Sequence, residues 1–468
     1  MKISSINRRS FKHIIAAVQG TKYAARYGIS DKMSIEDYQK KVPIIAYSDI
    51  SRYITEIMNG KSNILSNDPV VAFAMTSGTT AKSKIIPHTR KSLEEYSKIE
   101  RKLFYNFIKK HPLIFRGKIV ILVGKAKNYE TAKGINVGAI SGIMASHIPA
   151  IFKNCIIGNP QQIDQIDESY RLEAISKMAK EQDVRLILSS SSAYLMDFIN
   201  ITLQSVSSKS IKDIWPNLCL VCYPTGGSAI FHEEFLSSLL PSVKTWDTGF
   251  GASEGYLSTS INVKEPIGIP NCLQYFLEFK REDGQVFLLE QVEYNVPYNL
   301  IISSINGLLR YEMNDIVVFE NKNNKKAMRY VGRSNYEISI VGERLTENQI
   351  IESVRWSQGV TGIKIPEFYF LAPAPRSNPP YSYSFIISTD DVRKLRDNVV
   401  GHFVNLVDRK LGEINVNYYN SRKITKLLGF PKIKIISSKE YGFLKNSFYH
   451  KSRFNGQGKE TRLVQINN

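Results

Sequence analysis

The stretch "VVAFAMTSGTTAKSKIIPHT", residues 70–89, passes from an apolar run directly into small, hydroxylated residues and then into lysines. Residues 70–75 are β-branched and apolar enough to form a buried strand. The residues after them cannot pack a core, but their hydroxyls, close backbone N–H groups and positive charge suit a polyphosphate. A solvated turn is the alternative interpretation, and a standard P-loop is rejected because Gly78 lies too close to Lys82. The candidate phosphate-binding residues are Thr76, Ser77, Gly78, Thr79 and Thr80, with Lys82 and Lys84.

The length and composition indicate a large folded protein. At 468 residues the chain exceeds the size of one hydrophobic core, so two or more domains are expected. Hydrophobic residues make up 43% and aromatic residues 11%, which excludes global disorder. No apolar run reaches the roughly eighteen residues of a membrane helix, and the N-terminal apolar run is too short for a signal peptide. We expect a soluble cytoplasmic protein that does not bind membranes, as a monomer or weak dimer.

The net charge is +19, and an excess of basic residues is typical of proteins that bind nucleic acid. Nucleic acid therefore has to be considered as a partner. The lysines are spread along the chain, however, and zinc-finger spacing, RNP-like aromatic motifs and basic repeats are absent from the sequence. The pattern therefore disfavours nucleic acid and is compatible with anionic small molecules. Cys219 and Cys222 lie in the apolar run "LCLVCY", which favours buried thiols over a zinc site.

The order of apolar and amphipathic segments predicts an α/β protein. Residues 1 to about 68 have a mainly helical pattern, after which strand candidates alternate with amphipathic stretches. Residues 308–331 then contain short β-rich runs, and the chain after about Arg333 follows a β, α, β order. This order predicts a large N-terminal domain of layered α/β sheets with a β-barrel-like part, and a smaller C-terminal α+β domain. The strand candidates are residues 118–123, 184–188, 218–223 and 299–303, and the helical ones are 169–181, 233–240 and 391–412.

Two glycine-containing stretches follow predicted strands. In "YPTGGSAIF", residues 223–231, an apolar run ends in Gly227 and Ser228, and the carboxyl end of a strand is where open α/β sheets bind ligands. A simple turn is the more common explanation of this stretch alone. The glycines of "KGINVGAISGIMASHIP", residues 133–149, allow either a cleft lining or helix packing.

The stretch "WDTGFGASEGYLS", residues 246–258, combines an aromatic residue with a carboxylate. Phe250 lies between two glycines and can lie flat beside an aromatic ligand. Glu254 follows in a tight loop, where its carboxylate can hold Mg²⁺, an ion that takes one or two protein carboxylates together with phosphate oxygens. A glycine loop with a surface glutamate is an equal alternative.

Two further stretches carry charged residues in polar settings. In "LLRYEMNDIVVF", residues 308–319, we predict two strands that flank Asn314 and Asp315. Asp315 either caps this turn or hydrogen-bonds both hydroxyls of a ribose. In "FNGQGKETRLV", residues 454–464, Lys459 lies on a glycine-opened segment, where a solvated lysine is the usual explanation.

Taken in order, these stretches resemble the superfamily of adenylate-forming enzymes, which includes acyl-CoA synthetases, peptide-synthetase adenylation domains and luciferase. Within it, the chain is identified as a member of the Gretchen Hagen 3 family of acyl acid-amido synthetases, of the bacterial type. The supporting stretches are "VPIIAYSDISRYI", "KIIPHT", "IWPNL", "YEMNDIVVF", "RYVGRSNYEISIVGERLTENQI" and "FNGQGKETRL", which together span nearly the whole chain. The motif lysine of the superfamily falls on Lys84, whereas Ala81 and Ser83 depart from its usual glycine and proline.

The resemblance implies residue roles in binding ATP and Mg²⁺. The loop of Thr76 to Thr80 with Lys84 would bind the departing pyrophosphate. Residues 1–333 would bind ATP and the acyl group, and residues 334–468 would form a mobile lid carrying a catalytic lysine. At the adenine, Gly227 and Ser228 would border the base, and Phe250 with Gly251 would stack on it. Ser253 would contact the α-phosphate, Glu254 would bind Mg²⁺, and Asp315 with Arg333 would bind the ribose. Arg333–Ser334 would form the hinge, and Lys459 would contact the substrate carboxylate and the α-phosphate.

The resemblance also implies a two-step reaction between small molecules, a carboxylic acid and an amine. The acid would react with Mg-ATP to give an acyl-adenylate and pyrophosphate, and the amine, typically of an amino acid, would take the acyl group and release AMP. Two alternatives stay open from the residues: an acyl-CoA or carrier-protein thioester ligase with the same first step, and a non-catalytic nucleotide-binding relative.

Overall fold

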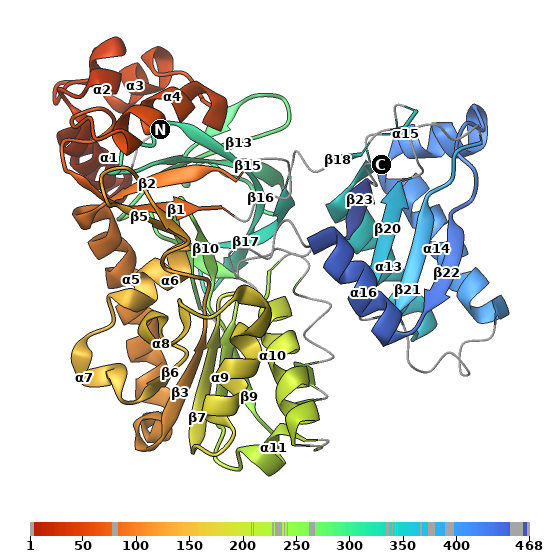
Figure 1. Cartoon of the computed structure of the whole chain (residues 1–468). Coiled ribbons are helices and arrows are strands. Elements are labelled where there is room, and N and C mark those ends of the chain that lie inside the picture. The colour runs from red at the N-terminus through yellow and green to blue at the C-terminus, as the bar shows by residue number, and fades with distance from the viewer. Residues whose placement is uncertain are drawn as a thin grey trace. The chain divides into compact units, whose positions relative to one another are not determined.

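The helices and strands of the chain, seen in a computed structural model, gather into two compact units (Figure 1). The first unit is built mainly from Met1–Gly226 and Leu236–Tyr330, and the second mainly from Val331–Lys451 and Lys459–Asn468. The layered α/β class predicted from the sequence is confirmed, whereas the roles assigned to residues 1–333 and 334–468 stay predictions. The structure describes residues 4–465 except 77–82, 207, 209, 227–228, 230–235, 238, 241, 262–266, 334–336, 339, 342, 344, 366, 373–379, 389–396 and 450–461.

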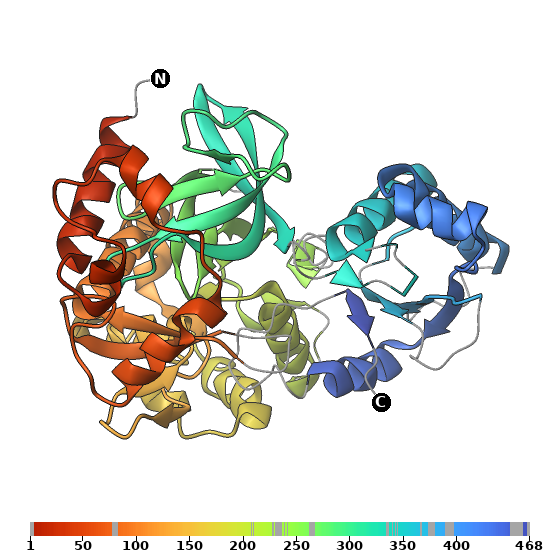
Figure 2. The same ribbon diagram turned by 90° about the horizontal axis from the view of Figure 1, so that it is seen from above.

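The N-terminal part of the first unit is helical, as its sequence pattern predicts. Three helices begin at a hydroxyl cap, because the side chains of Ser4, Thr21 and Ser34 accept hydrogen bonds from N–H groups of the first turn. Their apolar faces pack onto the sheets of this unit, as Phe11 does on Phe276 with ring centroids 5.4 Å apart. Figure 2 shows these helices, in red, along one side of the unit. They are α1 (Ser5–Val18), α2 (Lys22–Arg26), α3 (Ile35–Lys41) and α4 (Tyr47–Met58).

A four-stranded sheet in the order β2-β1-β5-β4 contains residues 70–75 and 85–89. The apolar run forms β1 as predicted, and β1 pairs antiparallel with β2. The long helix α5 follows β2 without a break. The elements here are β1 (Val70–Met75), β2 (Ile85–Thr89), α5 (Arg90–Lys110), the 3₁₀ helix η1 (Pro112–Arg116), β4 (Tyr129–Glu130) and β5 (Asn136–Gly138).

Two glycines of residues 133–149, Gly138 and Gly142, allow close packing. A Cβ added to Gly138 would lie 2.1 Å from the carbonyl oxygen of Ala126, and one added to Gly142 would lie 2.2 Å from that of Gly124. Both positions therefore need glycine, because backbone atoms occupy the place of a side chain. Of the two interpretations of this stretch, packing is thus the one supported at these two positions. The helices here are α6 (Ile140–Ser146) and α7 (Ala150–Lys153).

A five-stranded parallel sheet, in the order β6-β3-β7-β8-β9, forms the second layer of the first unit. Its central strands are buried, which explains their continuous apolar runs. The predicted strands at 118–123, 184–188 and 218–223 are confirmed within two residues. Cys222 is buried and Cys219 is partly buried, as predicted for structural thiols. The elements are β3 (Lys118–Leu122), β6 (Ile156–Ile157), α8 (Pro160–Ile163), η2 (Glu168–Tyr170), α9 (Arg171–Ala179), β7 (Val184–Ser189), α10 (Ser192–Ser205), α11 (Ile211–Ile214), β8 (Leu220–Tyr223) and β9 (Lys244–Asp247).

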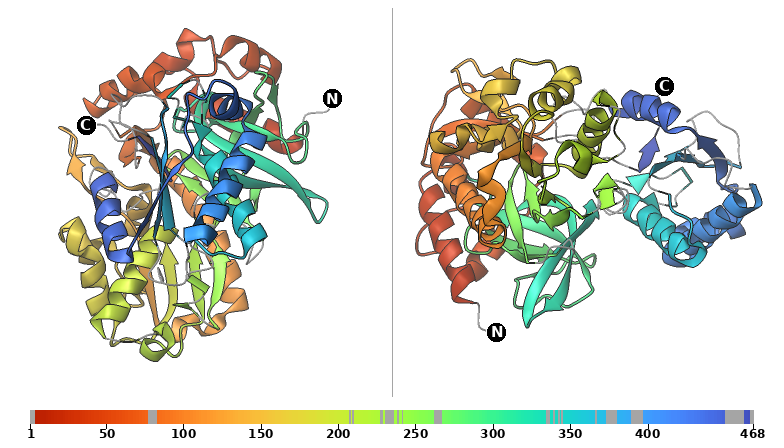
Figure 3. Two further views of the ribbon diagram at one scale, coloured as in Figure 1. Left: turned by 90° about the vertical axis from the view of Figure 1, so that its right-hand side faces the viewer. Right: turned by 90° about the horizontal axis from the view of Figure 1, so that it is seen from below.

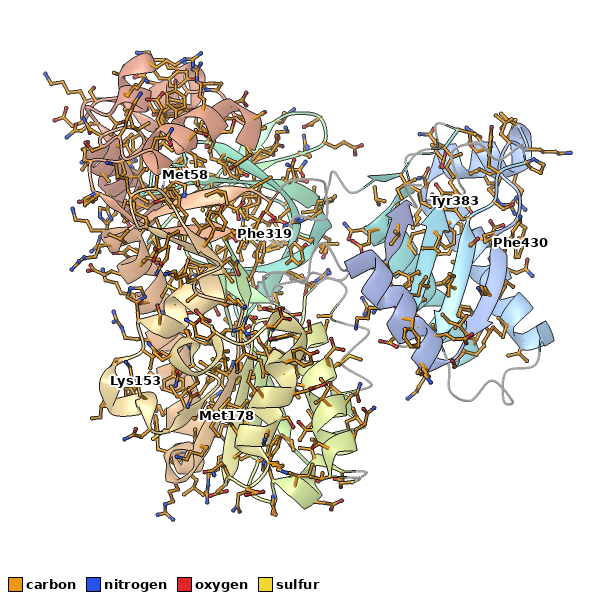
Figure 4. All side chains as sticks on the ribbon, in the orientation of Figure 1. Met58, Lys153, Met178, Phe319, Tyr383 and Phe430 are labelled. Carbon is orange, nitrogen blue, oxygen red and sulfur yellow. The ribbon has the colours of Figure 1, made fainter. Side chains whose placement is uncertain are left out.

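An eight-stranded antiparallel sheet, in the order β10-β11-β12-β17-β16-β15-β13-β14, completes the first unit and occupies the part predicted to be barrel-like. Phe319 of β16, labelled in Figure 4, packs edge to face on Phe279 with ring centroids 4.8 Å apart. Asn323 and Asn324 both have positive φ, as the tight hairpin turn between β16 and β17 requires. The strands are β10 (Phe250–Ala252), β11 (Gly255–Ser260), β12 (Gly268–Pro270), β13 (Phe276–Lys280), β14 (Val286–Phe287), β15 (Pro297–Ser303), β16 (Tyr311–Lys322) and β17 (Lys325–Arg333).

One prediction in this sheet is wrong. Asn314 and Asp315 do not separate two strands, because β16 runs without interruption from Tyr311 to Lys322. The register with β15 shifts at this point, with Asn299 opposite Ile316 and Ile301 opposite Glu312. Asn314 adopts a φ of 61°, which asparagine tolerates better than most residues. The polar pair therefore marks a β-bulge inside a strand, a feature often found beside active sites.

The second unit is a mixed four-stranded sheet, β22-β21-β20-β23, with helices on both faces (Figure 3). Alternate residues of β20 point to opposite faces: Phe368 and Phe370 join a core with α13 and α14, while Tyr369 stacks on Tyr441 of α16. The predicted helix at 391–412 is observed from Asp397. The elements are β18 (Glu337–Ile338), β19 (Leu345–Thr346), α13 (Glu347–Thr361), β20 (Glu367–Ala372), β21 (Ser384–Ser388), α14 (Asp397–Ile414), α15 (Val416–Tyr419), the π-helical turn η4 (Asn420–Ile424), β22 (Lys432–Ile436), α16 (Ser438–Tyr449) and β23 (Leu463–Gln465).

None of the helices in the described part of the chain is both long enough and apolar enough to cross a bilayer.

Candidate active site

The ends of β1 and β2 hold the base of the predicted phosphate-binding loop. The backbone N–H of Thr76 donates to the carbonyl of Lys84 over 2.9 Å, and the N–H of Lys84 donates to the Thr76 hydroxyl over 3.0 Å. These two bonds join the residues on either side of the loop. The loop itself, with Ser77, Gly78, Thr79 and Thr80, lies outside the described residues.

The side chain of Lys84 meets the eight-stranded sheet. Its Nζ donates to the hydroxyl of Tyr311 over 3.0 Å, and it lies 5.5 Å from the centre of the Tyr311 ring and 6.0 Å from that of Tyr47. The Tyr47 hydroxyl in turn accepts from the N–H of Ile85 over 2.9 Å, which ties α4 to the start of β2. The bond from Lys84 to Tyr311 thereby joins two separate motifs, the lysine after the loop and the strand that carries Asp315. Asp315 itself is buried at the bulge of β16.

A second group of residues gathers at the carboxyl ends of β8 and β9. Asp247 ends β9, and its carboxylate accepts from the backbone N–H of Thr225, which follows β8, over 2.9 Å. Burial raises the pKa of Asp247 to about 6 even though the N–H groups of Thr225 and Gly249 donate to the carboxylate. This bond connects the loops after two neighbouring strands, which is where open α/β sheets bind ligands.

Phe250 packs on an aromatic residue that the sequence analysis did not single out. Its ring lies 4.6 Å from that of Tyr330 with 30° between the planes. A Cβ on Gly226 would lie 3.4 Å from the same tyrosine ring, so Gly226, which follows β8, also lies against Tyr330. Gly251, the next residue of β10, is exposed. Gly227 and Ser228 fall outside the described residues.

Ser253 and Glu254 form the two-residue loop between β10 and β11, and both are buried. The carbonyl of Ser253 accepts a hydrogen bond of 2.8 Å from Nε2 of His88, on β2. His88 is 2% exposed, and its Nδ1 lies 3.2 Å from the hydroxyl of Ser92. Burial lowers the pKa of His88 to about 4, so the imidazole is neutral at physiological pH.

The candidate metal ligand is the single carboxylate of Glu254. Among the residues that the structure describes, His, Cys, Asp and Glu side chains form no cluster of three or more able to hold a metal. This donor set suits Mg²⁺ delivered with ATP, because that ion takes one or two carboxylates together with phosphate oxygens.

One predicted residue belongs to the second unit. Arg333 is the last residue of β17, and the boundary between the units falls inside this strand, after Tyr330. Lys459 lies outside the described residues. The structure therefore brings together Thr76, Lys84 and Tyr311 on one side, and His88, Ser253 and Glu254 on another, within the first unit.

Sequence reasoning missed His88, Asp247, Tyr311 and Tyr330. A signal was present for His88, because a histidine inside the apolar strand "KIIPHT" needs a buried partner. Asp247 likewise ends an apolar run in "TWD". Tyr311 and Tyr330 carried no such signal, since tyrosines are common in strands.

The buried imidazole of His88 predicts acid sensitivity of the fold. The unfolded chain takes up this proton near pH 6.5, whereas the folded chain takes it up only near pH 4. The unfolded state binds more protons between these values, so the free energy of unfolding falls as the pH drops from 6.5 towards 4. We expect a loss of about 3 kcal/mol over this window. Urea unfolding across this pH range measures it, and His88→Gln should remove this part of the slope; an unchanged slope in that variant would contradict the assignment.

Three family models match the chain. The GH3 family N-terminal domain matches residues 1–204, the GH3 family central domain residues 272–333, and the GH3 family C-terminal domain residues 348–468. The indole-3-acetic acid-amido synthetase GH3.3 of Arabidopsis thaliana is 22% identical over 93% of this chain and 85% of its own length. The jasmonoyl-L-amino acid synthetase JAR6 of Nicotiana attenuata is 21% identical over 92% of this chain and 86% of its own.

Solved structures share the fold. The GH3.15 acyl acid amido synthetase in complex with 2,4-DB has a TM-score of 0.84 at 18% identity, covering 98% of this chain and 91% of that one. A 2-hydroxyisobutyryl-CoA ligase in the postadenylation state has a TM-score of 0.59 at 11% identity, covering 98% and 89%. The chain thus has the fold of an acyl acid amido synthetase and of a CoA ligase. It belongs to the GH3 family and is an ATP-dependent acid-amido synthetase.

Proposed function

We propose that the chain joins a small carboxylic acid to an amino acid in two steps. The carboxylate attacks the α-phosphate of Mg-ATP, a mixed anhydride bond forms, and pyrophosphate leaves. The amine of the amino acid then attacks the acyl carbon, the amide bond forms, AMP leaves with the electrons of the broken anhydride bond, and the amine loses a proton. The Arabidopsis and Nicotiana relatives support this substrate class, since their names specify indole-3-acetic acid and jasmonoyl groups with amido or amino acid products.

The contact between Lys84 and Tyr311 is the observation that carries the proposal. Positive charge is needed where pyrophosphate develops negative charge as it leaves, and it acts best when held in advance. The 3.0 Å bond to the buried Tyr311 holds the Lys84 ammonium in one place. Tyr311 starts the strand that carries Asp315. One nucleotide can therefore meet a phosphate ligand and a ribose ligand within the same unit.

We assign the remaining contacts by role. Ser253 would meet the α-phosphate, Glu254 the Mg²⁺ that accompanies ATP, and Asp315 the ribose hydroxyls, with Arg333 assisting. Phe250 would lie beside the adenine. Lys459 would bridge the substrate carboxylate and the α-phosphate during the first step. The loop residues Thr76, Ser77, Gly78, Thr79 and Thr80 would bind pyrophosphate, and Gly227, Ser228 and Gly251 would border the base.

Pyrophosphate release tests the proposal. The protein is incubated with Mg-ATP and a panel of acids that includes indole-3-acetate, jasmonate and 4-substituted benzoates, each alone and then with pooled amino acids or with CoA. We expect acid-dependent release that rises on addition of an amino acid, with AMP and an amide as products. The amide is identified by mass spectrometry.

The other outcomes separate the alternatives. Stimulation by CoA alone, with a thioester product, would assign the chain to the thioester ligases instead. Failure to bind Mg-ATP, together with no pyrophosphate release for any acid, would identify a non-catalytic relative.

A further inference from the structure

The loop that carries Glu254 has an unfavourable conformation for its length. Ala252 pairs with Gly255, so Ser253 and Glu254 form a two-residue hairpin loop. The favoured turns of this length, types I′ and II′, need positive φ at the first central residue. Neither Ser253 nor Glu254 is among the described residues with positive φ. The register of the hairpin also shifts between Phe250 and Gly251. The hairpin therefore depends on contacts from outside it.

Aromatic side chains hold both strands beside the turn. A Cβ on Gly255 would lie 2.8 Å from the ring of Tyr275, whose hydroxyl accepts from the N–H of Tyr256 over 3.0 Å. A Cβ on Gly251 would lie 3.1 Å from the hydroxyl of Tyr96, on α5. These contacts hold the two strands on either side of the turn.

His88 contacts the turn itself. A carbonyl oxygen only accepts, so the 2.8 Å bond between Nε2 of His88 and the Ser253 carbonyl requires the proton to be on Nε2. Nδ1 then carries no proton and lies 3.2 Å from the Ser92 hydroxyl, which also donates to the Thr89 carbonyl over 2.9 Å. Since the imidazole stays neutral over the working pH range, this tautomer persists.

Lys84 directly precedes β2, the strand that carries His88. The two residues lie four positions apart, a span of about 13 Å for extended chain. His88 is opposite Ala72 in the pairing of β2 with β1, and Lys84 bonds to Thr76 at the end of β1. The turn of Glu254 is thus bonded to β2, and the phosphate-loop lysine lies at the start of the same strand.

We propose that His88 is a positioning residue, which sets the direction of Glu254 by holding the Ser253 carbonyl. The peptide between Ser253 and Glu254 is planar and trans, so a carbonyl turned towards His88 directs the Glu254 N–H to the opposite side. Because the pairing of Gly255 with Ala252 holds the backbone on the other side of Glu254, the two constraints together restrict the direction of its Cα–Cβ bond. This inference rests on the proposed function, in which Glu254 meets the Mg²⁺ of Mg-ATP.

The test compares two substitutions of the full-length chain. The amide nitrogen of His88→Gln reaches the position of Nε2 and can still donate to Ser253, whereas that of His88→Asn reaches only the position of Nδ1. We measure the dissociation constants of Mg-ATP and of ATP with EDTA by calorimetry, and the Mg²⁺ concentration for half-maximal pyrophosphate release. His13→Asn, at an exposed position of α1, is the control.

We expect His88→Asn to weaken Mg-ATP binding about tenfold and to raise the Mg²⁺ requirement, because a buried carbonyl loses its donor and the turn relaxes. Its affinity for ATP with EDTA should stay within about twofold, and His88→Gln should remain within about threefold of wild type in both constants. Thermal unfolding of each variant shows whether the fold is intact.

Two results would overturn the proposal. One is wild-type Mg²⁺ dependence in folded His88→Asn. The other is an equal loss in both variants that affects ATP with and without Mg²⁺ alike, which would make His88 a purely structural residue. Failure of the proposed function is separate: wild-type protein would then release no pyrophosphate with any acid, while the metal dependence of nucleotide binding could still be compared among the variants.

Discussion

Replacement of Lys459 by alanine is expected to slow acyl-adenylate formation about a hundred- to a thousandfold, while the affinity for Mg-ATP changes little. Removal of one preorganised donor to a transition state costs about 2.7 to 4 kcal/mol. We assign Lys459 this role because it follows two glycines in "FNGQGKETRL", at the position of the catalytic lysine in the family resemblance. A donor used mainly in the transition state contributes to the rate and little to ground-state binding.

Single-turnover pyrophosphate release measures this effect, and calorimetry measures Mg-ATP binding. Lys439→Ala is the matched control, since Lys439 is an exposed lysine of α16. Pyrophosphate release at the wild-type rate in Lys459→Ala would refute the role. A parallel loss of Mg-ATP affinity would instead make Lys459 a general nucleotide ligand.

Replacement of Arg310 by methionine is expected to lower the free energy of unfolding by about 3 to 5 kcal/mol, the cost of leaving a buried charge without its partner. The guanidinium of Arg310 makes two bonds of 3.0 Å to the carboxylate of Glu278, and the two side chains are 6% and 0% exposed. Its remaining amino group donates to the carbonyls of Gln39 and Val42 over 2.6 and 2.8 Å. One side chain thus ties α3 and the residue after it to the eight-stranded sheet.

Urea unfolding followed by tryptophan fluorescence measures the loss. Arg281→Met is the matched control: its pair with Asp283 is 29% and 43% exposed, so we expect a change below about 1 kcal/mol. The double variant Arg310→Met with Glu278→Met should recover part of the loss, because it removes the uncompensated carboxylate. Equal effects of Arg310→Met and Arg281→Met would show that burial does not govern this pair.

Much of the architecture follows from local patterns. The apolar run before the hydroxyl-rich loop becomes β1 with the predicted bounds, and the runs at 118–123 and 184–188 become β3 and β7 within one residue. Such runs are recognisable because a strand buried on both faces needs apolar residues throughout. The order of the motifs was also sufficient to identify the family, which the three domain models confirm.

The error at Asn314 and Asp315 shows where local patterns end. A turn and a β-bulge both favour a residue that tolerates positive φ, so the same pair is compatible with either. Only the pairing of β15 with both sides of the bulge identifies a single long strand.

Local sequence patterns are sufficient for the fold class, for several strands made of continuous apolar runs and for the family, because periodicity and motif order act over short windows. Tertiary structure alone decided which distant residues meet. His88 and Ser253 are separated by 165 positions, and Lys84 and Tyr311 by 227. Local sequence can indicate that a residue such as His88 needs a partner, but it does not identify which distant residue that partner is. The contacts that hold the candidate site therefore emerge only when packed sheets bring their strand ends together.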